Sequence, residues 1–351
     1  MKKYKKIIIF LITTVMILSL TACGGGETEP GQESGNLPEE INVGIMRIAN
    51  DEMIAIGEGL FDEYFESKGI KINHIVFDSG AEANQALASG SIDFAAMGNV
   101  NSVVSLSRDL GVELIWIHDI LGESECLVAK EGSGVENVED LIGKKVATPF
   151  ASTCHYLLLN VLQEAGIEDE VNILDMQTTE IVAAWERGDI DAAYSWQPTL
   201  DNLMQTGNVL LSSADLIERG YITADVGVVR KEFSAKYPEL VVDFIAVLEE
   251  GKQIYLNVPQ RAGEIVAAEL EIPKEDVLRQ MAGFIMVPAE ELVKDQYMGT
   301  SENPGNFTKV MKSTGDFLLE QKSIEYSPSQ EEFNEFVNPE YIEKYLERES
   351  N

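Results

Sequence analysis

The chain has 351 residues, of which 60 are acidic and 26 are basic, giving a formal net charge of −34. Such acidity argues against nucleic acid or an anionic membrane surface as a partner, because both would be repelled. It does not indicate a cationic ligand, since net charge describes the whole surface and not one cleft. A hydrophobic content of 45% and this length are typical of a globular protein of about two domains.

The first 23 residues have the pattern of an export signal. Four lysines precede an apolar run, residues 7–20, which is too short to span a membrane comfortably. The run ends in Leu-Thr-Ala-Cys23, which resembles the bacterial lipobox. That resemblance implies removal of residues 1–22 and a lipid on Cys23, which would anchor an extracytoplasmic protein to the cell membrane. A plain secretory signal with a chance cysteine is the alternative.

The segment that follows the lipobox is a predicted tether. Residues 23–40 contain the lipidated cysteine and are otherwise rich in Gly, Glu, Ser and Pro, a composition typical of a flexible linker. No second apolar run of about 18 residues follows in the sequence, so the remainder is expected to be a folded body outside the membrane.

From residue 41 short apolar strands alternate with amphipathic helices. In the first set we expect strands at 41–45, 72–77, 93–97 and 113–118, with helices at 51–68, 81–88 and 100–110. In the second set we expect strands at 145–148, 171–174 and 191–194, with helices near 138, at 152–166, at 181–188 and near 200. This alternation predicts an α/β protein of two lobes, each a mostly parallel sheet flanked by helices.

The C-terminal third is predicted to be helical. Prolines and acidic residues mark helix starts, and the expected helices are 238–255, 259–270, 274–284, 288–298, 306–321 and 341–347. We expect these extra helices to pack on the first lobe.

Three stretches of sequence carry a family resemblance: residues 77–93, 141–156 and 181–198. Together with the export signal they resemble the nitrate/sulfonate/taurine group of ABC-transporter solute-binding proteins, and within it taurine-binding proteins most. The resemblance implies a type II periplasmic-binding fold whose two lobes close over a small ligand. The first lobe would comprise 41–127 plus 225–351, and the second 128–224.

A sulfonate or similar anion needs hydrogen-bond donors and positive potential, and a helix N-terminus supplies both. Ser152, Thr153 and Tyr156 lie where a predicted strand turns into a helix, so we expect them to contact the anion. A plain helix cap with a packed tyrosine is the alternative for these three residues.

Other candidate ligand contacts lie at the ends of predicted strands, where open α/β sheets bind ligands. In the first lobe these are Ser79, Gly80, Asn99 and Arg47, although Arg47 is equally compatible with a surface position.

The taurine-type pattern carries an acid at Glu125 and at Asp225, where an ammonium group would need a carboxylate. Trp196 is expected to wall the cleft and Gln177 to point into it.

The sequence also departs from the taurine pattern near this pocket. The differing positions are Arg47-Ile48, Glu123, Cys154, Thr178-Thr179 and Gly227. These departures leave the predicted fold intact and put the identity of the ligand in doubt.

Several chemistries are not supported by the sequence. Cys154 and His155 are adjacent on a helix and point about 100° apart, so they do not form a nucleophile–base pair. The three histidines have no metal-ligand spacing, no phosphate-binding loop is present, and no cofactor is expected. Whether Cys126 and Cys154 form a disulfide stays open.

The sequence therefore predicts a monomeric binding component of an ABC importer, working with a permease and separate ATPase subunits, and not an enzyme. Its ligand would be a small anion or zwitterion such as taurine. The alternatives are a binder of nitrate, bicarbonate or a thiamine-precursor pyrimidine, a fold-related enzyme of thiamine-precursor metabolism, or a tethered sensor that presents its ligand to a receptor.

Overall fold

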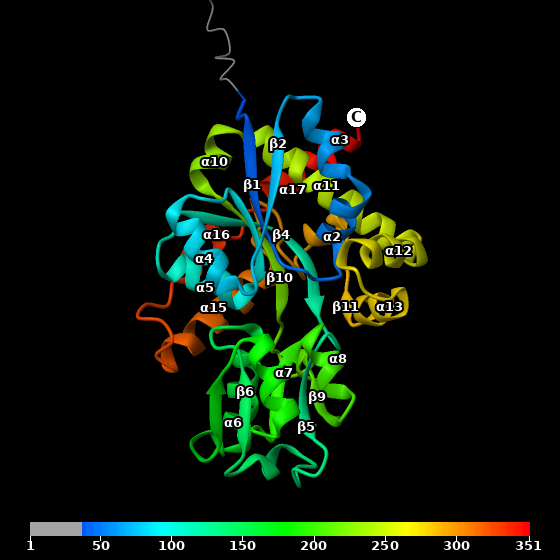
Figure 1. The fold of residues 1–351 in the computed structure, drawn as a ribbon. Coiled ribbons are helices and arrows are strands. Elements are labelled where there is room, and N and C mark those ends of the chain that lie inside the picture. Colours follow the sequence, from blue (N-terminus) through cyan, green and yellow to red (C-terminus); the bar gives the residue numbers. More distant parts are fainter. Residues whose placement is uncertain (1–36) are drawn as a thin grey trace, which may run out of the picture. The chain divides into compact units, whose positions relative to one another are not determined.

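The structure, a computed structural model, describes residues 37–351. The predicted export segment, Cys23 and all but the last four residues of the tether lie outside the described residues. The described chain forms two sheets, each flanked by helices (Figure 1). Over residues 37–351 we find no helix with the length and apolar character needed to cross a bilayer.

The first lobe is built on a six-stranded sheet of order β11-β4-β10-β3-β1-β2. Its strands are β1 (Glu40–Ile45), β2 (Lys71–Val76), β3 (Phe94–Gly98), β4 (Val112–Leu121), β10 (Ala224–Arg230) and β11 (Phe284–Ile285). β1 pairs in parallel with β2 and β3, whereas β10 lies between β3 and β4 and is antiparallel to both. β3 and β4 are buried along their whole length, in keeping with helices on both faces.

The second lobe is built on a five-stranded sheet of order β7-β6-β8-β5-β9. Its strands are β5 (Glu125–Lys130), β6 (Lys145–Thr148), β7 (Asn172–Asp175), β8 (Ala192–Trp196) and β9 (Gly207–Ser212). β6 pairs in parallel with β7 and β8, whereas β5 lies between β8 and β9 and is antiparallel to both.

The predicted two-lobed α/β fold is confirmed, but the sheets are more mixed than mostly parallel. In each sheet an antiparallel strand is inserted, and it is the strand that arrives from the other lobe: β5 follows β4, and β10 follows the second sheet. Such a strand begins at the end of the sheet where the neighbouring strands finish, so it is antiparallel to those neighbours. β5 begins three residues before the predicted lobe boundary at 128, and the assignment of lobe boundaries stays a prediction.

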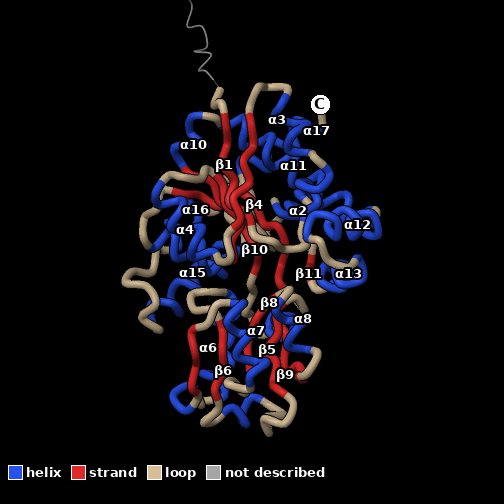
Figure 2. Tube along the Cα trace, in the orientation of Figure 1, coloured by secondary structure: helices blue, strands red, loops and turns tan. Residues whose placement is uncertain are grey.

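Helices flank both sheets (Figure 2). In the second lobe they are α6 (Thr153–Ala165), α7 (Thr178–Arg187), α8 (Thr199–Met204) and α9 (Ser213–Ile217), with short 3₁₀ turns η1 (Val138–Leu141) and η2 (Glu168–Glu170). In the first lobe they are α2 (Asp51–Glu58), α3 (Leu60–Glu66), α4 (Gly80–Ser89), α5 (Asn99–Ser107), α10 (Lys231–Lys236), α11 (Pro238–Asn257), α12 (Pro259–Leu270), α13 (Lys274–Ala282), α14 (Ala289–Leu292), α15 (Asn306–Glu320), α16 (Gln330–Phe336) and α17 (Glu340–Glu349).

Three helix predictions differ from the structure. The helix expected near 138 is only the 3₁₀ turn η1. The single helix expected over 51–68 is divided into α2 and α3 at Gly59, whose φ of 81° is a left-handed conformation that glycine adopts at low cost. The helix expected over 288–298 is reduced to α14, four residues long.

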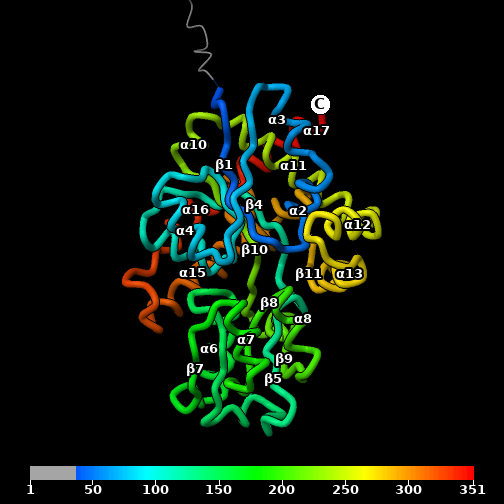
Figure 3. Tube along the Cα trace, viewed as in Figure 1, coloured from blue at the N-terminus to red at the C-terminus, as the bar shows by residue number. Residues whose placement is uncertain are grey.

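The C-terminal helices complete the first lobe, as predicted. Figure 3 shows the orange and red segments beside the blue and cyan ones, and α11 packs on α2 while α15 packs on α5. Long-range packing of this kind buries the N-terminal strands beneath the end of the chain. It also places the carboxyl ends of β1, β3 and β4 toward the second lobe, where the candidate site lies.

Candidate functional site

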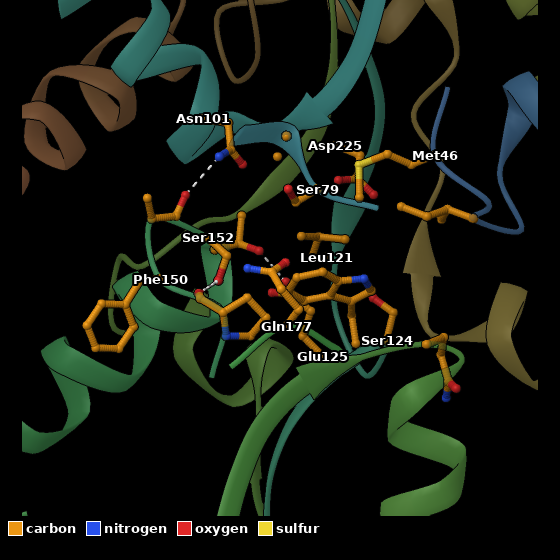
Figure 4. Close-up of a pocket in the computed structure, with 18 of the residues that line it drawn as sticks. Met46, Ser79, Asn101, Leu121, Ser124, Glu125, Phe150, Ser152, Gln177 and Asp225 are labelled. Atoms are coloured by element: carbon orange, nitrogen blue, oxygen red, sulfur yellow. Dashed lines mark hydrogen bonds between the residues drawn. The ribbon is translucent and has the colours of Figure 1, made fainter. Parts of the chain in front are cut away.

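A cavity lies between the carboxyl ends of the strands of the two sheets. Residues from both lobes line it, including Ser79 and Asp225 from the first and Ser152 and Gln177 from the second (Figure 4). Its volume is about 50 Å³, room for a few water molecules and hence for a small ligand.

Four helices begin at this cavity. The residues that cap the N-termini of α4, α5, α6 and α7 all line it: Ser79, Gly98, Ser152 and Gln177. Helix N-termini carry partial positive charge and leave N–H groups without intrahelical acceptors. Because none of the described residues that line the cavity is Lys, Arg or His, these helix starts are its source of positive potential.

The start of α6 has a defined hydrogen-bond arrangement. Ser152 Oγ donates to the carbonyl of Pro149 at 2.6 Å and accepts from the N–H of His155 at 3.1 Å. Thr153 Oγ1 donates to Glu125 Oε1. Both hydroxyl protons are therefore in use, and the donors left for an anion are the backbone N–H groups of the first turn. The helix start predicted from sequence lines the cavity, with backbone rather than hydroxyl donors.

Glu125 is a buried carboxylate that is already satisfied. Besides Thr153, the hydroxyls of Ser213 and Thr223 donate to Oε2 at 3.0 and 3.3 Å, and Cys154 Sγ lies 3.4 Å from Oε1. Burial raises the pKa of Glu125, and these donors oppose that rise. With 1% of its surface exposed, Glu125 holds β5, α6, α9 and the chain before β10 together at the edge of the cavity.

The carboxyl group of Asp225, unlike that of Glu125, receives no hydrogen bonds from the described residues. Asp225 lines the cavity from β10 and is 6% exposed. Burial, together with the charge of Glu125, raises the pKa of Asp225 to about 7. A buried carboxylate without donors is costly, so Asp225 is the acid in this cavity with capacity for a cationic group of a ligand.

The remaining wall of the cavity is largely apolar. Its apolar side chains are Met46, Ile48, Leu121, Trp196 and Phe284. Ser124, which lies between β4 and β5, has a buried hydroxyl with no hydrogen-bond partner among the described residues. The cavity therefore combines an apolar surface with a few polar groups, an arrangement typical of small-molecule sites.

The two lobes touch directly around the cavity. Asn101 Nδ2 on α5 donates to the carbonyl of Ala151 in the loop before α6 at 2.8 Å. At Gly98, a Cβ atom would lie 2.9 Å from Thr153 Cγ2, so the lobes approach as closely as glycine permits. These contacts hold the two lobes together beside the cavity.

Eight of the eleven residues predicted from sequence to contact a ligand line this cavity. They are Ser79, Gly80, Glu125, Ser152, Thr153, Gln177, Trp196 and Asp225. Their contact with a ligand stays a prediction, but the structure brings them together from strand ends far apart in the sequence.

The other three predicted residues lie elsewhere. Tyr156 is buried against Phe317 and Tyr221, one turn beyond the start of α6. Asn99 is fully buried, and its Oδ1 accepts from the N–H of Ala224. Arg47 is exposed and donates to the carbonyl of Leu270 at 2.9 Å. Each follows a correctly predicted strand or helix start, but its side chain points away from the cavity.

Sequence reasoning missed Asn101, Ser124 and Gln197, which also line the cavity. Asn101 lies two residues beyond Asn99 on the same helix start, a step of about 200° that turns the side chain from the core to the cavity. Only knowledge of where α5 begins distinguishes the two asparagines.

Both described cysteines are free and buried. Burial, followed by the charge of Glu125, raises the pKa of Cys126 to about 12 and that of Cys154 well above its ordinary value. Neither thiol lines the cavity, so the structure holds no thiolate at this site.

A protein-family model described as "NMT1/THI5 like" matches residues 61–262. The taurine-binding periplasmic protein of Escherichia coli is 34% identical over 74% of this chain and 81% of its own length. A putative aliphatic sulfonates-binding protein of Bacillus subtilis is 25% identical over 99% of this chain and 98% of its own length.

Solved structures show the same fold. The periplasmic aliphatic sulphonate binding protein SsuA from Escherichia coli superposes with a TM-score of 0.69 at 19% identity, covering 86% of this chain and 99% of that one. The desulfurization enzyme DSZB superposes with a TM-score of 0.65 at 15% identity, covering 89% of this chain and 100% of that one.

Proposed function

Since the chain belongs to the NMT1/THI5-like family, we propose that it is the substrate-binding component of an ABC importer and captures a small sulfonate, taurine or a related compound. The curated relatives at 34% and 25% identity are named for taurine and aliphatic sulfonates, which supports this class of ligand. The observation that carries the proposal is the chemistry of the cavity, which offers helix N-termini to an anionic group and a carboxyl group without donors to a cationic one.

The anionic pole of the ligand lies at the helix starts. Ser152 caps the N–H of His155, which leaves the N–H groups of Thr153 and Cys154 at the start of α6 without intrahelical acceptors. The helices α4, α5 and α7 begin at the same cavity. A sulfonate presents three oxygens, which suits several converging donors. Cations are not needed for recognition, in agreement with their absence from the described cavity lining.

The cationic pole lies at Asp225, whose carboxyl group lacks donors. Glu125, the other acid predicted for this role, already accepts from four side chains and is better suited to holding the site together. The apolar side chains of the cavity lining suit a short alkyl chain. Taurine, an ammonium and a sulfonate joined by two carbons, combines all three features.

The location of the protein follows from its N-terminal sequence. In this proposal Cys23 carries the lipid, residues 24–40 are the tether, and the monomeric body presents its ligand to a membrane permease powered by separate ATPase subunits. Replacing Cys23 with Ala in the full chain should move the protein from the membrane fraction to the soluble extracytoplasmic fraction.

An enzymatic function on the same fold is the rival proposal, because the desulfurization enzyme DSZB shares the fold. The cavity of this chain has no described thiol, and the pKa values of both buried cysteines are raised, which leaves no thiolate nucleophile. Binding without chemical change is the function that these side chains support.

The test is a thermal-shift and calorimetric panel on residues 24–351. It includes taurine, ethanesulfonate, nitrate, bicarbonate and a thiamine-precursor pyrimidine, since a bound ligand raises the melting temperature by mass action. We expect taurine to give the largest shift and ethanesulfonate a smaller one. A shift with nitrate, bicarbonate or the pyrimidine alone would reject the sulfonate, and conversion of any ligand during incubation would reject a binding-only function.

A further inference from the structure

Two buried aspartates face each other at the base of the cavity. Asp225 on β10 lines the cavity, and Asp119 on β4 is its directly opposite neighbour in the antiparallel pair. Side chains so opposed project to the same face with Cβ atoms about 5 Å apart. Asp119 is 0% exposed and does not line the cavity itself, so it lies behind Asp225 as seen from a ligand.

Neither aspartate has the donors that normally stabilise a buried carboxylate. Among the described residues, neither oxygen of Asp119 has a hydrogen-bond partner. The side chain of Asn50 is close enough to favour the ionised form of Asp119, but it does not reach hydrogen-bond geometry. Asp225 likewise receives no hydrogen bond. Glu125, by contrast, accepts hydrogen bonds from four side chains.

The cations near the pair are already engaged by another acid. His118 Nδ1 lies 2.7 Å from Asp51 Oδ1, and Lys252 Nζ lies 3.4 Å from Asp51 Oδ2. Lys252 also donates to two backbone carbonyls. The other titratable groups that face the pair are Glu52 on α2, Glu125 on β5 and Tyr255 on α11. None of these three supplies a positive charge.

Two carboxylates in this position cannot both ionise without a large repulsive cost. Burial, followed by the charge of Asp225, raises the pKa of Asp119 well above its ordinary value, in keeping with this geometry. A carboxylic acid that keeps its proton can donate it as a hydrogen bond, and the group directly opposite is the carboxyl of Asp225.

We propose that Asp119 keeps a proton at neutral pH and donates it as a hydrogen bond to Asp225, so that the pair offers one negative charge and selects ligands with an ammonium group. This rests on the proposed function and adds to it a specificity-determining residue that no ligand touches. When an ammonium group binds, any proton on Asp225 leaves for the solvent. The ligand keeps its three ammonium protons and Asp119 keeps its own, so binding releases a fraction of one proton.

The first test is calorimetry of taurine and ethanesulfonate in buffers of different ionisation enthalpy. Near pH 7, taurine should release about half a proton, because the pKa of Asp225 is about 7. Ethanesulfonate, which lacks the ammonium, should release none. Binding of both ligands with equal proton release would overturn the inference and leave the proposed function standing. Binding of neither would reject the proposed function instead.

The second test compares variants of Asp119. Asp119→Leu removes the donor, so its taurine affinity should fall by about tenfold more than its ethanesulfonate affinity. Asp119→Asn retains a donor and should lose less of this discrimination. Glu113→Gln is the control, because Glu113 is a buried acid at the other end of β4, and the ratio of the two affinities should not move. Equal losses for both ligands in Asp119→Leu would indicate a purely structural role.

A third measurement needs no ligand and no apolar variant. The protonated carboxyl of Asp119 should give a C=O stretching band in the infrared spectrum of the ligand-free protein at about pH 8, above the pKa of Asp225. Asp119→Asn should lose that band, and Glu113→Gln should keep it. A difference spectrum, wild type minus Asp119→Asn, isolates the contribution of Asp119 from those of the other buried acids. The absence of a protonated-carboxyl band from this difference spectrum would show that Asp119 is ionised and would refute the inference.

Discussion

Arg279 on α13 of the first lobe donates from Nε to Asp201 on α8 of the second lobe at 3.2 Å, and its Nη2 lies 3.0 Å from the same carboxylate. Gln280 Nε2 adds a third contact to Asp201 at 3.1 Å. The N–H of Asp201 in turn donates to Oε1 of Gln197, which lines the cavity. This ion pair joins the lobes on one side of the cavity, and the Asn101–Ala151 hydrogen bond also joins them across it.

Replacing Arg279 with Ala should therefore weaken the contact between the lobes without touching the ligand. All ligands should lose affinity by the same factor, roughly twofold to tenfold, mainly through faster dissociation. Asp276 also pairs with Arg279 but lies on the same helix, so Asp276→Asn is the matched control and should keep near wild-type affinity. Stopped-flow dissociation rates measure the effect, and a change confined to one ligand would contradict this explanation.

Asp225→Asn should discriminate between ligands. Taurine affinity should fall by about tenfold to a hundredfold, because a charge-assisted contact to the ammonium is lost. Ethanesulfonate should lose much less. Calorimetry near pH 8, where Asp225 is ionised, measures both, and equal losses would remove the ammonium role of Asp225.

Gly98→Ala should obstruct the approach of the two lobes. The new Cβ atom would lie 2.9 Å from Thr153 Cγ2, and Thr153 cannot turn away because its hydroxyl is bonded to Glu125. Gly98 has a φ of −63°, which alanine adopts without strain, so the melting temperature should hardly change while every ligand binds more weakly. Thr153→Ser removes Cγ2 and keeps the hydroxyl, so the double variant should regain affinity. A double variant as weak as Gly98→Ala would exclude the steric explanation.

Glu125→Gln should lower the free energy of unfolding by about 2–4 kcal/mol, because an amide cannot accept from four donors and brings two protons of its own. The exposed neighbour Glu123 provides the control variant Glu123→Gln, which should change stability little. Chemical denaturation of both variants measures the difference, and equal effects would show that the hydroxyl contacts contribute nothing.

The stability of the ligand-free protein should fall as pH rises from about 5 to about 8. Burial raises the pKa of Glu52 from 4.5 to about 7, so the folded state binds more protons than the unfolded state in this range. Glu52→Gln cannot ionise and should flatten the profile by up to about 3 kcal/mol. Urea denaturation at a series of pH values tests this, and parallel profiles for the two proteins would contradict the assignment to Glu52.

Much of the fold was predictable because it depends on local patterns. The apolar run Lys145–Thr148 and the proline-started helix Pro259–Leu270 were placed to the residue, since strand and helix periods differ and proline fixes a helix start. The strands β5, β9, β10 and β11 were not predicted. Their residues follow neither the strand nor the helix period clearly, and the direction of β5 and β10 is set by their arrival from the other lobe.

The sequence by itself determined the class of protein, the positions of most strand ends, and a set of loops that had to meet if the sheets were parallel. Only the tertiary structure decided which side chains in those loops face the cavity, because a step of one or two residues on a helix start turns a side chain from the site to the core. It also decided between the two acids. Glu125 and Asp225 are equivalent in sequence, yet hydroxyls from α6, α9 and the chain before β10 converge on one and leave the other without a donor.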